Sequence, residues 1–573
     1  MQAQDNRLWL MKTTKNKNIP VKKGPEATST SNIFTRFPYI IIAIVGFLLY
    51  AHTLKFDYTN MDDKTLIADD KAFVSKLSSI PEAFHLDVFK EKGGTFYRPL
   101  FVTSLIIDGS LGKMSFAVYH FSNILFHVLA GCLLFSLLIK LEIKRESSLL
   151  LSLFLIIHPA LVQAVAWIPG RNDSLLAIFV LSSFIMLMNF IKSHKTIHFV
   201  LHSLFFLMAL FTKETAIILP ILYLLMIKFW SEGKLFSKAN INYLVLWITS
   251  IIILFIARSH AIQTSKGATP IKFLSNIPNN LAAFFLYFGK ILLPFNLSVI
   301  PTIADGTIIY GLITIAIIAA VFLLSKTKFS SLAIFGGCWF ILFIIPILIV
   351  PKESAFFYEQ RLYLPLMGIL IMSGQLILKA TKQTSKYFNG SILVLIICFI
   401  PINFLYSKNF SGKMNFWNNA LATSPNSVYV NKIAASVYYK DNNLEKAEEL
   451  NLIALKLNPA EPFVNNDLGI IFQDKKEWEK AIACFQKEIA ISPTSDKSYY
   501  NLAYSYYSMH NLEVSEKYFE KTITLNPEYK EAYQSLALVN ADLKNFERAR
   551  YYTAEAQKRG IVPPKEFLEY IQK

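Results

Sequence analysis

Apolar stretches long enough to cross a lipid bilayer recur through the first 406 residues of this 573-residue chain and stop after Tyr406. A bilayer core about 30 Å thick requires roughly 20 apolar residues per helix. Because 53% of all residues are hydrophobic, an ordinary soluble protein is excluded. The sequence therefore predicts an all-α protein: a polytopic bundle of transmembrane helices over residues 38–406, followed by a soluble helical region.

The excess of positive charge is confined to the apolar part of the chain. Residues 407–573 contain 21 basic and 21 acidic residues, so the first 406 residues carry the entire net charge of +17. Their Lys and Arg residues cluster in short segments between apolar stretches, and placing these clusters in the cytoplasm satisfies the positive-inside rule. No nucleic-acid-binding motif accompanies the charge, so we expect no nucleic-acid partner. This arrangement predicts eleven spans, near residues 38–56, 117–139, 147–166, 174–191, 197–212, 214–230, 243–260, 308–325, 331–350, 362–378 and 389–406.

Two segments of the apolar part differ from a simple span. The basic N-terminal tail, residues 1–37, is expected in the cytoplasm, before a first span that is retained as a signal anchor. The stretch 280–301 is apolar but interrupted by Pro294 and Pro301, so we interpret it as re-entrant or interfacial. Eleven crossings place the loop 57–116 and the C-terminal region together on the extracytoplasmic side.

The C-terminal region is periodic. Ser or Asn followed by Pro recurs every 34 residues, at Pro425, Pro459, Pro493 and Pro527, and small residues keep the same period. A 34-residue period with small residues at the helix crossing and Pro at the repeat end is typical of tetratricopeptide repeats. The sequence predicts a linker, about four repeats that form an α-solenoid, and a C-terminal tail, at residues 407–426, 427–561 and 562–573.

Charged residues gather on the predicted outer face, close to the ends of the apolar stretches. Such charges are costly near hydrocarbon unless they are paired or face a water-filled cavity. Two interpretations stay open: structural ion pairs, or a cavity in which cations hold a phosphate and a carboxylate acts as a base. The second suits glycosyl transfer from a lipid phosphate, which needs no nucleotide-binding fold. The candidate residues are Asp62, Asp63, Arg98, Arg171, Asp173, Lys213, Glu214, Glu359, Arg361 and Tyr363.

Four segments favour the second interpretation. The sequences YRPL, HPALVQAVAWIPGRNDSLLA, LFTKETAIILP and YEQRLYLPLMG occur in this order and are followed by the repeats. Together they resemble the transmembrane and tetratricopeptide-repeat-containing O-mannosyltransferases and their bacterial relatives, which belong to the GT-C superfamily of membrane glycosyltransferases. The resemblance covers nearly the whole chain after residue 37.

The resemblance implies a donor of the polyprenyl- or dolichyl-phosphate-mannose type and an inverting single displacement on the extracytoplasmic face. It also implies that the pair Asp62-Asp63 contains the catalytic base. The chain departs from the family at Met61 and Lys64, which flank the pair, and at Gln163, where the family has Glu; we expect Gln163 to be peripheral to the chemistry. The residues expected to bind the phosphate or sugar of the donor are Arg98, Arg171, Asp173, Lys213, Glu214, Glu359, Arg361 and Tyr363.

The acceptor and the compartment are less constrained. We expect Ser or Thr hydroxyls of a protein held by the repeats, since solenoids usually bind polypeptides. The alternatives are a lipid or cell-envelope glycan acceptor, and a non-catalytic membrane scaffold. The Lys-, Ile- and Asn-rich composition favours a bacterial inner membrane with periplasmic repeats; in a eukaryote the repeats would lie in the lumen of the endoplasmic reticulum. No cofactor is predicted besides the lipid-linked sugar phosphate that serves as donor, and a need for a divalent cation stays open.

Histidine and cysteine residues support no metal or disulfide prediction. His120 and His127 lie two helical turns apart on one face, where lining a cavity and bonding between helices are equally compatible with the sequence. The four cysteines form no C-x-x-C pair, so neither a disulfide nor a zinc site is expected.

Overall fold

The protein is described here by a computed structural model, which covers residues 36–90, 94–231, 238–262, 275–324, 330–349, 356–378 and 382–572. These residues form helices and connecting segments and contain no β-strand, which confirms the predicted all-α class. The expected cytoplasmic tail, residues 1–37, lies almost entirely outside them. The structure also leaves out most residues of three basic segments that support the predicted topology, those near Lys234, Lys326 and Lys379.

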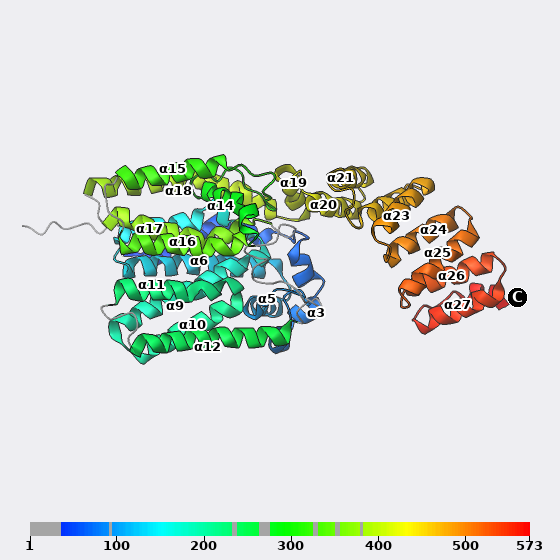
Figure 1. Cartoon of the computed structure of the whole chain (residues 1–573), viewed down its shortest axis with the longest axis horizontal. Coiled ribbons are helices and arrows are strands. Elements are labelled where there is room, and N and C mark those ends of the chain that lie inside the picture. The colour runs from blue at the N-terminus through cyan, green and yellow to red at the C-terminus, as the bar shows by residue number, and fades with distance from the viewer. Residues whose placement is uncertain are drawn as a thin grey trace, which may run out of the picture.

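A bundle of apolar helices forms the first part of the protein, and most of them run side by side along one direction (Figure 1). A helix lies at each of the eleven predicted spans. The bundle consists of α2 (Pro38–Tyr50), α5 (Pro99–Leu111), α6 (Phe116–Lys140), α7 (Arg145–Ile157), α8 (Gln163–Ala166), α9 (Arg171–Ser193), α10 (Thr196–Thr212), α11 (Leu219–Trp230), α12 (Lys238–Ala261), α14 (Ile277–Leu292), α15 (Ile309–Leu324), α16 (Ser331–Leu348), α17 (Tyr363–Leu378) and α18 (Lys382–Ser407).

Six helices in the described part of the chain are long and apolar enough to cross a membrane. A seventh candidate is the bent pair formed by α7 and residues Pro159–Ala166. Three further apolar helices, α5, α10 and α15, are shorter than that criterion requires. These helices indicate a membrane protein, while the topology with eleven spans stays a prediction.

Close backbone contact explains how neighbouring helices pack without large side chains between them. Gly336 of α16 faces Gly368 of α17, and a Cβ atom on Gly336 would lie only 2.5 Å from the carbonyl oxygen of Gly368. Any larger residue would therefore push the two helices apart. Small residues at helix contacts are the usual means of packing in membranes, where no hydrophobic effect draws helices together.

Helix α14 occupies the segment for which the sequence predicted a re-entrant or interfacial element. Near its N-terminus, the amide of Asn280 donates a hydrogen bond of 2.9 Å to the carbonyl of Leu348, at the C-terminal end of α16. Near its C-terminus, Lys290 pairs with Glu359, which lies just before α17. Both ends of α14 thus contact residues on the same side of the bundle, and α14 is not among the helices that meet the spanning criterion.

The predicted outer loop, residues 57–116, is folded instead of extended. It contains the short helices η2 (Lys64–Ala68), α3 (Lys71–Val74), η3 (Leu77–Ser79) and α4 (Ile80–Ala83), before α5 begins. Its apolar side chains, among them Ile67, Val74 and Ile106, form a separate small core. The acidic pair therefore sits in a structured unit at the end of the bundle.

The C-terminal part is an array of paired helices that leaves the end of the bundle and then bends, so that its last helices lie level with α3 and α5 at the bundle end (Figure 1). Each helix pair spans about one 34-residue period of the sequence. The array comprises the pairs α20 (Val428–Lys440) and α21 (Leu444–Leu457), α22 (Val464–Asp474) and α23 (Trp478–Ile491), α24 (Asp496–Ser508) and α25 (Leu512–Leu525), and α26 (Lys530–Asp542) and α27 (Phe546–Lys558), followed by α28 (Lys565–Gln572).

The segment between bundle and array is helical and packed against the bundle. It contains α19 (Lys413–Thr423). The hydroxyl of Ser424 donates to the carbonyl of Ile300 at 2.6 Å, and the side-chain oxygen of Asn419 accepts from the backbone N–H of Val299 at 3.1 Å. These bonds join the start of the array to the bundle end that carries the acidic pair.

Candidate active site

Asp63 is buried, and its carboxylate accepts hydrogen bonds from residues of its own loop. One oxygen accepts hydrogen bonds from the backbone N–H of Thr59 at 2.7 Å and from the Thr59 hydroxyl at 2.9 Å. The other accepts from the backbone N–H of Met61 at 3.1 Å. Burial raises the pKa of Asp63, and these hydrogen bonds oppose that rise. The side chain therefore holds the loop in shape.

Thr59 connects this loop to the bundle and to the segment before the array. Its hydroxyl accepts a hydrogen bond from the indole N–H of Trp167 at 3.2 Å. Its carbonyl accepts one from the indole N–H of Trp417, in α19, also at 3.2 Å. Both indoles are almost fully buried. The position of the acidic pair is thus set by three parts of the chain that are far apart in sequence.

Asp62 differs from its neighbour because its side chain is only partly buried and accepts no hydrogen bond from the described residues. Burial and the negative charge of Asp63 raise the pKa of Asp62 to about 6, and the positive charge of Arg98 opposes that rise. A carboxylate with a raised pKa and unused oxygen atoms can take up a proton near neutral pH.

Three cations lie near one another at the same end of the bundle. Arg98, which caps the start of α5, pairs with Glu214 at 3.0 Å. Lys213, which follows α10, pairs with Asp173 at 2.6 Å. Burial lowers the pKa of Lys213, Asp173 opposes this, and the charges of Arg98 and Arg361 lower it further. The last two effects require that these three cations share one neighbourhood.

Of these three cations, Arg361 forms the fewest interactions with other side chains. Its side chain is half-buried, and it forms neither an ion pair nor a side-chain hydrogen bond with any residue in the described ranges. Its guanidinium carbon lies 5.6 Å from the centroid of the Tyr358 ring. The guanidinium is therefore positioned by an aromatic face and keeps its donors for another partner, such as a phosphate.

Arg171 does not join this group, contrary to the prediction that it binds the donor. Its side chain is fully buried. One amino group pairs with Asp108 of α5 at 2.5 Å, and the other donates to the carbonyl of Tyr119 in α6 at 2.7 Å. Because its charge is neutralised inside the protein, Arg171 serves to join α5, α6 and α9.

Glu359 and Tyr363 are also fully buried and bonded to other residues, in place of the predicted contact with the donor. Glu359 is fully buried, pairs with Lys290 at 2.5 Å and accepts from the backbone N–H of Ser298 at 2.8 Å. The hydroxyl of Tyr363 lies 2.7 Å from Nδ1 of His127, inside the bundle. Both side chains are used in packing the region that supports Arg361.

Gln163 and the two histidines also lie in the interior. The amide of Gln163 donates to the carbonyl of Val299 at 3.0 Å and accepts from the backbone N–H of Glu359 at 3.1 Å. His127 bonds to residues of two other helices, since its Nε2 lies 3.0 Å from the carbonyl of Ile156. His120 is buried with its ring edge-on to that of Phe56. For His127 the structure favours bonding between helices over lining a cavity.

Asp108 and Lys290 are partners that the sequence reasoning missed. Each is a lone charge inside an otherwise apolar stretch, in α5 and α14 respectively. Such a charge usually marks a buried counter-charge, and this signal was available in the sequence. Two aromatic residues near Asp62, Tyr358 and Tyr429, were also missed, and no spacing in the sequence connects them.

No group of three or more His, Cys, Asp or Glu side chains in the described part of the chain is arranged to hold a metal ion. The arrangement as it stands combines one available carboxylate, Asp62, with three cations. It can accept a proton and stabilise an anion within one site.

Two kinds of known sequence are similar to this chain. The tetratricopeptide-repeat family matches residues 500–561, which confirms that the C-terminal region contains tetratricopeptide repeats. Protein O-mannosyl-transferase TMTC3 of Homo sapiens is 31% identical over 96 residues, covering 17% of this chain and 10% of that protein. Protein O-mannosyl-transferase Tmtc1 of Drosophila melanogaster is 26% identical over 176 residues, covering 30% of this chain and 20% of that protein. The matches thus span between a tenth and a fifth of these relatives.

Similar solved structures cover about a quarter of the chain. The crystal structure of MamA is 24% identical, with a TM-score of 0.25, and covers 26% of this chain and 89% of its own. The PilF structure from Pseudomonas aeruginosa is 20% identical, with a TM-score of 0.26, and covers 28% of this chain and 72% of its own.

Proposed function

We propose that this chain is an integral-membrane glycosyltransferase that moves mannose from a polyprenyl- or dolichyl-phosphate donor to Ser or Thr hydroxyls of proteins. The transfer would take place on the extracytoplasmic side. The observation that carries the proposal is the position of Asp62, an available carboxylate with a raised pKa, in the same neighbourhood as Arg98. The partial similarity to two protein O-mannosyl-transferases supports the same chemistry.

The reaction is a single displacement at the anomeric carbon of the sugar. The hydroxyl oxygen of the acceptor forms a bond to this carbon while the bond from the carbon to the phosphate oxygen breaks, so the configuration is inverted. Asp62 takes the proton that the hydroxyl loses. The departing lipid phosphate gains negative charge, which Arg361, Lys213 and Arg98 stabilise. Atoms and charge balance with no further reactant.

Asp173 and Glu214 limit how much positive charge the site carries. Each is paired with one cation, at 2.6 Å for Asp173 with Lys213 and at 3.0 Å for Glu214 with Arg98. Without a donor bound, three uncompensated cations at a membrane surface would repel one another. We infer that these carboxylates position Lys213 and Arg98, while Arg361 makes the most direct contact with the phosphate.

The lipid tail of the donor requires an apolar path along the bundle. A groove of about 380 Å³ between α2 and α6 is lined by apolar side chains alone, including Phe47 and Phe121. It opens on the outside of the bundle, where many large apolar side chains are exposed. Because both helices flank the folded loop that carries Asp62, this groove is our candidate for the lipid tail.

The free carboxylate of Asp62 supports an enzyme more than a non-catalytic scaffold. A scaffold requires only that charges at the bundle end pair with each other, as Arg171 and Asp108 do. Asp62 and Arg361 have no such partner in the described residues. A lipid or glycan acceptor would use the same two residues. Only the chemical nature of the labelled product distinguishes it from a protein acceptor.

The proposal is tested by transfer of label from radioactive polyprenyl-phosphate-mannose in membranes that contain the full-length protein. We expect a labelled product that is destroyed by protease and is missing when Asp62→Asn replaces the wild type. A labelled product that resists protease would replace the protein acceptor by a lipid or glycan. If neither this donor nor other lipid-phosphate sugars give a product dependent on the wild-type protein, the enzymatic proposal is wrong.

The rate of transfer should depend on pH through Asp62. The carboxylate must be deprotonated to accept a proton, and its pKa is raised to about 6. We therefore expect kcat/KM to fall about tenfold per pH unit below about pH 6 and to level off above it. A profile measured with purified protein in detergent checks this, provided that the protein stays folded at each pH. A flat profile down to about pH 4 would contradict the raised pKa of Asp62.

A further inference from the structure

The first helix of the repeat array contacts the loop that carries Asp62. The hydroxyl of Tyr429, in α20, lies 3.5 Å from the sulfur of Met61, the residue before Asp62. Burial raises the pKa of Tyr429 to about 12, and the negative charge of Asp62 contributes. The array is therefore not merely tethered to the bundle, because one of its side chains is part of the surroundings of Asp62.

Tyr429 belongs to a row of aromatic rings around Asp62. Its ring centroid lies 4.8 Å from that of Phe356, which lies 5.8 Å from that of Tyr358. Tyr358 lies 5.8 Å from Trp167. Tyr358 also experiences the charges of Asp62 and Arg361, so the row runs from the cations past the carboxylate to the array. Two separate segments of the bundle supply Trp167 and the pair Phe356 and Tyr358, and the array supplies Tyr429.

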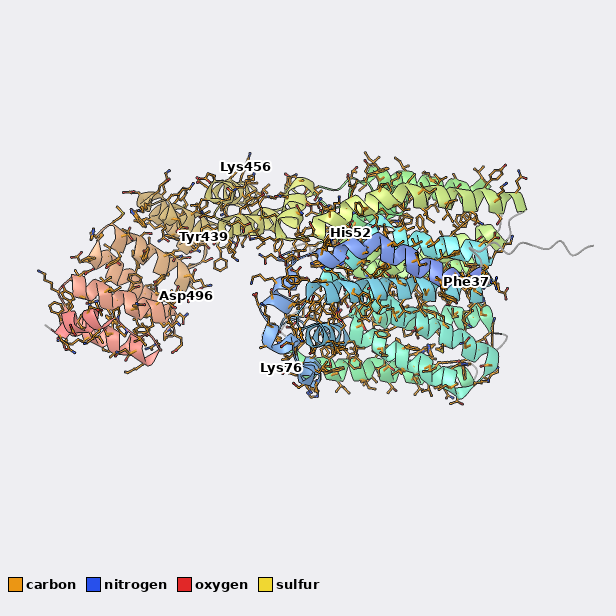
Figure 2. All side chains as sticks on the ribbon, turned by 180° about the vertical axis from the view of Figure 1, so that it is seen from behind. Phe37, His52, Lys76, Tyr439, Lys456 and Asp496 are labelled. Carbon is orange, nitrogen blue, oxygen red and sulfur yellow. The ribbon has the colours of Figure 1, made fainter. Side chains whose placement is uncertain are left out.

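The inner side of the curved array continues from this row. Lys432 lies one turn after Tyr429 on α20, and its ammonium lies 5.8 Å from the ring centroid of Phe463, which begins the next helix pair. The Phe463 side chain is 48% exposed. Figure 2 places Tyr439, at the end of α20, on the inner side of the curve and Lys456 on the outer side. A partly exposed surface thus leads along the array to Tyr429.

We propose that Tyr429 is an acceptor-positioning residue, and that the acceptor is an extended polypeptide whose hydroxyl-bearing residue lies between Tyr429 and Asp62. The proposal rests on the proposed glycosyltransferase function and adds that the repeat array forms one wall of the reaction site. Aromatic side chains supply large rigid contact area for a peptide at low entropy cost.

The position of Tyr429 fits the acceptor better than the donor. The cations expected to hold the lipid phosphate come from the ends of bundle helices: Arg98 before α5, Lys213 after α10 and Arg361 before α17. Tyr429 comes from the array, which extends away from the bundle (Figure 1). Because a lipid-linked donor would reach Asp62 from the bundle, we expect the polypeptide to approach from the side of Tyr429.

The test compares two acceptors in the radioactive transfer assay with the full-length protein. One is a Thr-containing peptide of about ten residues, and the other is the minimal acceptor N-acetyl-threonine methylamide. We expect Tyr429→Ala to raise the KM for both acceptors, about tenfold for the peptide, and to leave the KM for the donor within about twofold. Tyr429→Phe should behave like the wild type, because it keeps the ring next to Phe356.

Tyr551→Ala is the matched control, since Tyr551 is 60% exposed on α27, in the last helix pair. It should change none of these constants. Tyr429→Leu keeps apolar volume against Phe356 and replaces the alanine variant if that variant unfolds. An unchanged peptide KM in Tyr429→Ala and Tyr429→Leu, with active wild type, would overturn the positioning role. A lack of transfer by the wild type with either acceptor or with endogenous proteins would instead overturn the proposed function.

Discussion

Asp62→Asn is expected to lower kcat for transfer by about three orders of magnitude while the protein stays folded. Removal of a general base typically costs between about 10² and 10⁴ in rate. Asparagine has nearly the same shape and leaves no donor or acceptor unpaired, since Asp62 takes no hydrogen bond from the described residues. Transfer from labelled polyprenyl-phosphate-mannose gives the rate, and thermal unfolding in detergent gives the stability.

The matched variant Asp63→Asn should lose stability, unlike Asp62→Asn. Its carboxylate accepts three hydrogen bonds, from the backbone and hydroxyl of Thr59 and from the backbone of Met61. In asparagine an NH2 group replaces one oxygen, so a hydrogen-bond donor would face the N–H or O–H donors that now bind that oxygen. We expect the folded loop to lose about 3 kcal/mol, and activity to fall as the loop disorders.

The two variants together identify the base. If Asp63→Asn abolished transfer without any change in unfolding temperature, while Asp62→Asn remained active, the assignment would have to be reversed. Equal loss in both, with no loss of stability, would mean that the pair titrates as one unit.

Arg171→Met is expected to reduce the free energy of unfolding by about 3–5 kcal/mol, the usual effect of removing one partner of a buried ion pair. Asp108 would then be buried without its counter-charge, and the carbonyl of Tyr119 would lose its donor. Chemical denaturation in detergent, or the yield of folded protein, measures the loss. Adding Asp108→Leu should recover part of it, because the isolated charge is removed as well.

Arg361→Met is the contrasting change. Its guanidinium pairs with no residue in the described ranges, so stability should change by less than about 0.5 kcal/mol. Loss of a charged hydrogen bond to the phosphate should weaken donor binding by about 10- to 100-fold. If Arg361→Met destabilised the protein while Arg171→Met weakened only donor binding, the roles assigned to the two residues would be exchanged.

The sequence by itself determined the class of fold and its two regions. The length of the apolar stretches requires helices, because every backbone group must be satisfied within the hydrocarbon. The 34-residue period requires paired helices, because each repeat buries its apolar face only against its neighbours. These are local and periodic properties, so they can be read along the chain without knowledge of any distant contact.

The tertiary structure decided which charged residues are available for chemistry. Arg171 and Arg361 are both arginines near the ends of apolar stretches, yet one meets Asp108, 63 residues earlier, and the other meets no carboxylate in the described residues. Asp62 and Asp63 are adjacent, but the turn of the loop buries one and leaves the other partly open. Tyr429 reaches Met61 across 368 residues. Such pairings depend on how distant segments pack, because burial and neighbouring charge, which follow from packing, determine whether a charged group can act on a substrate.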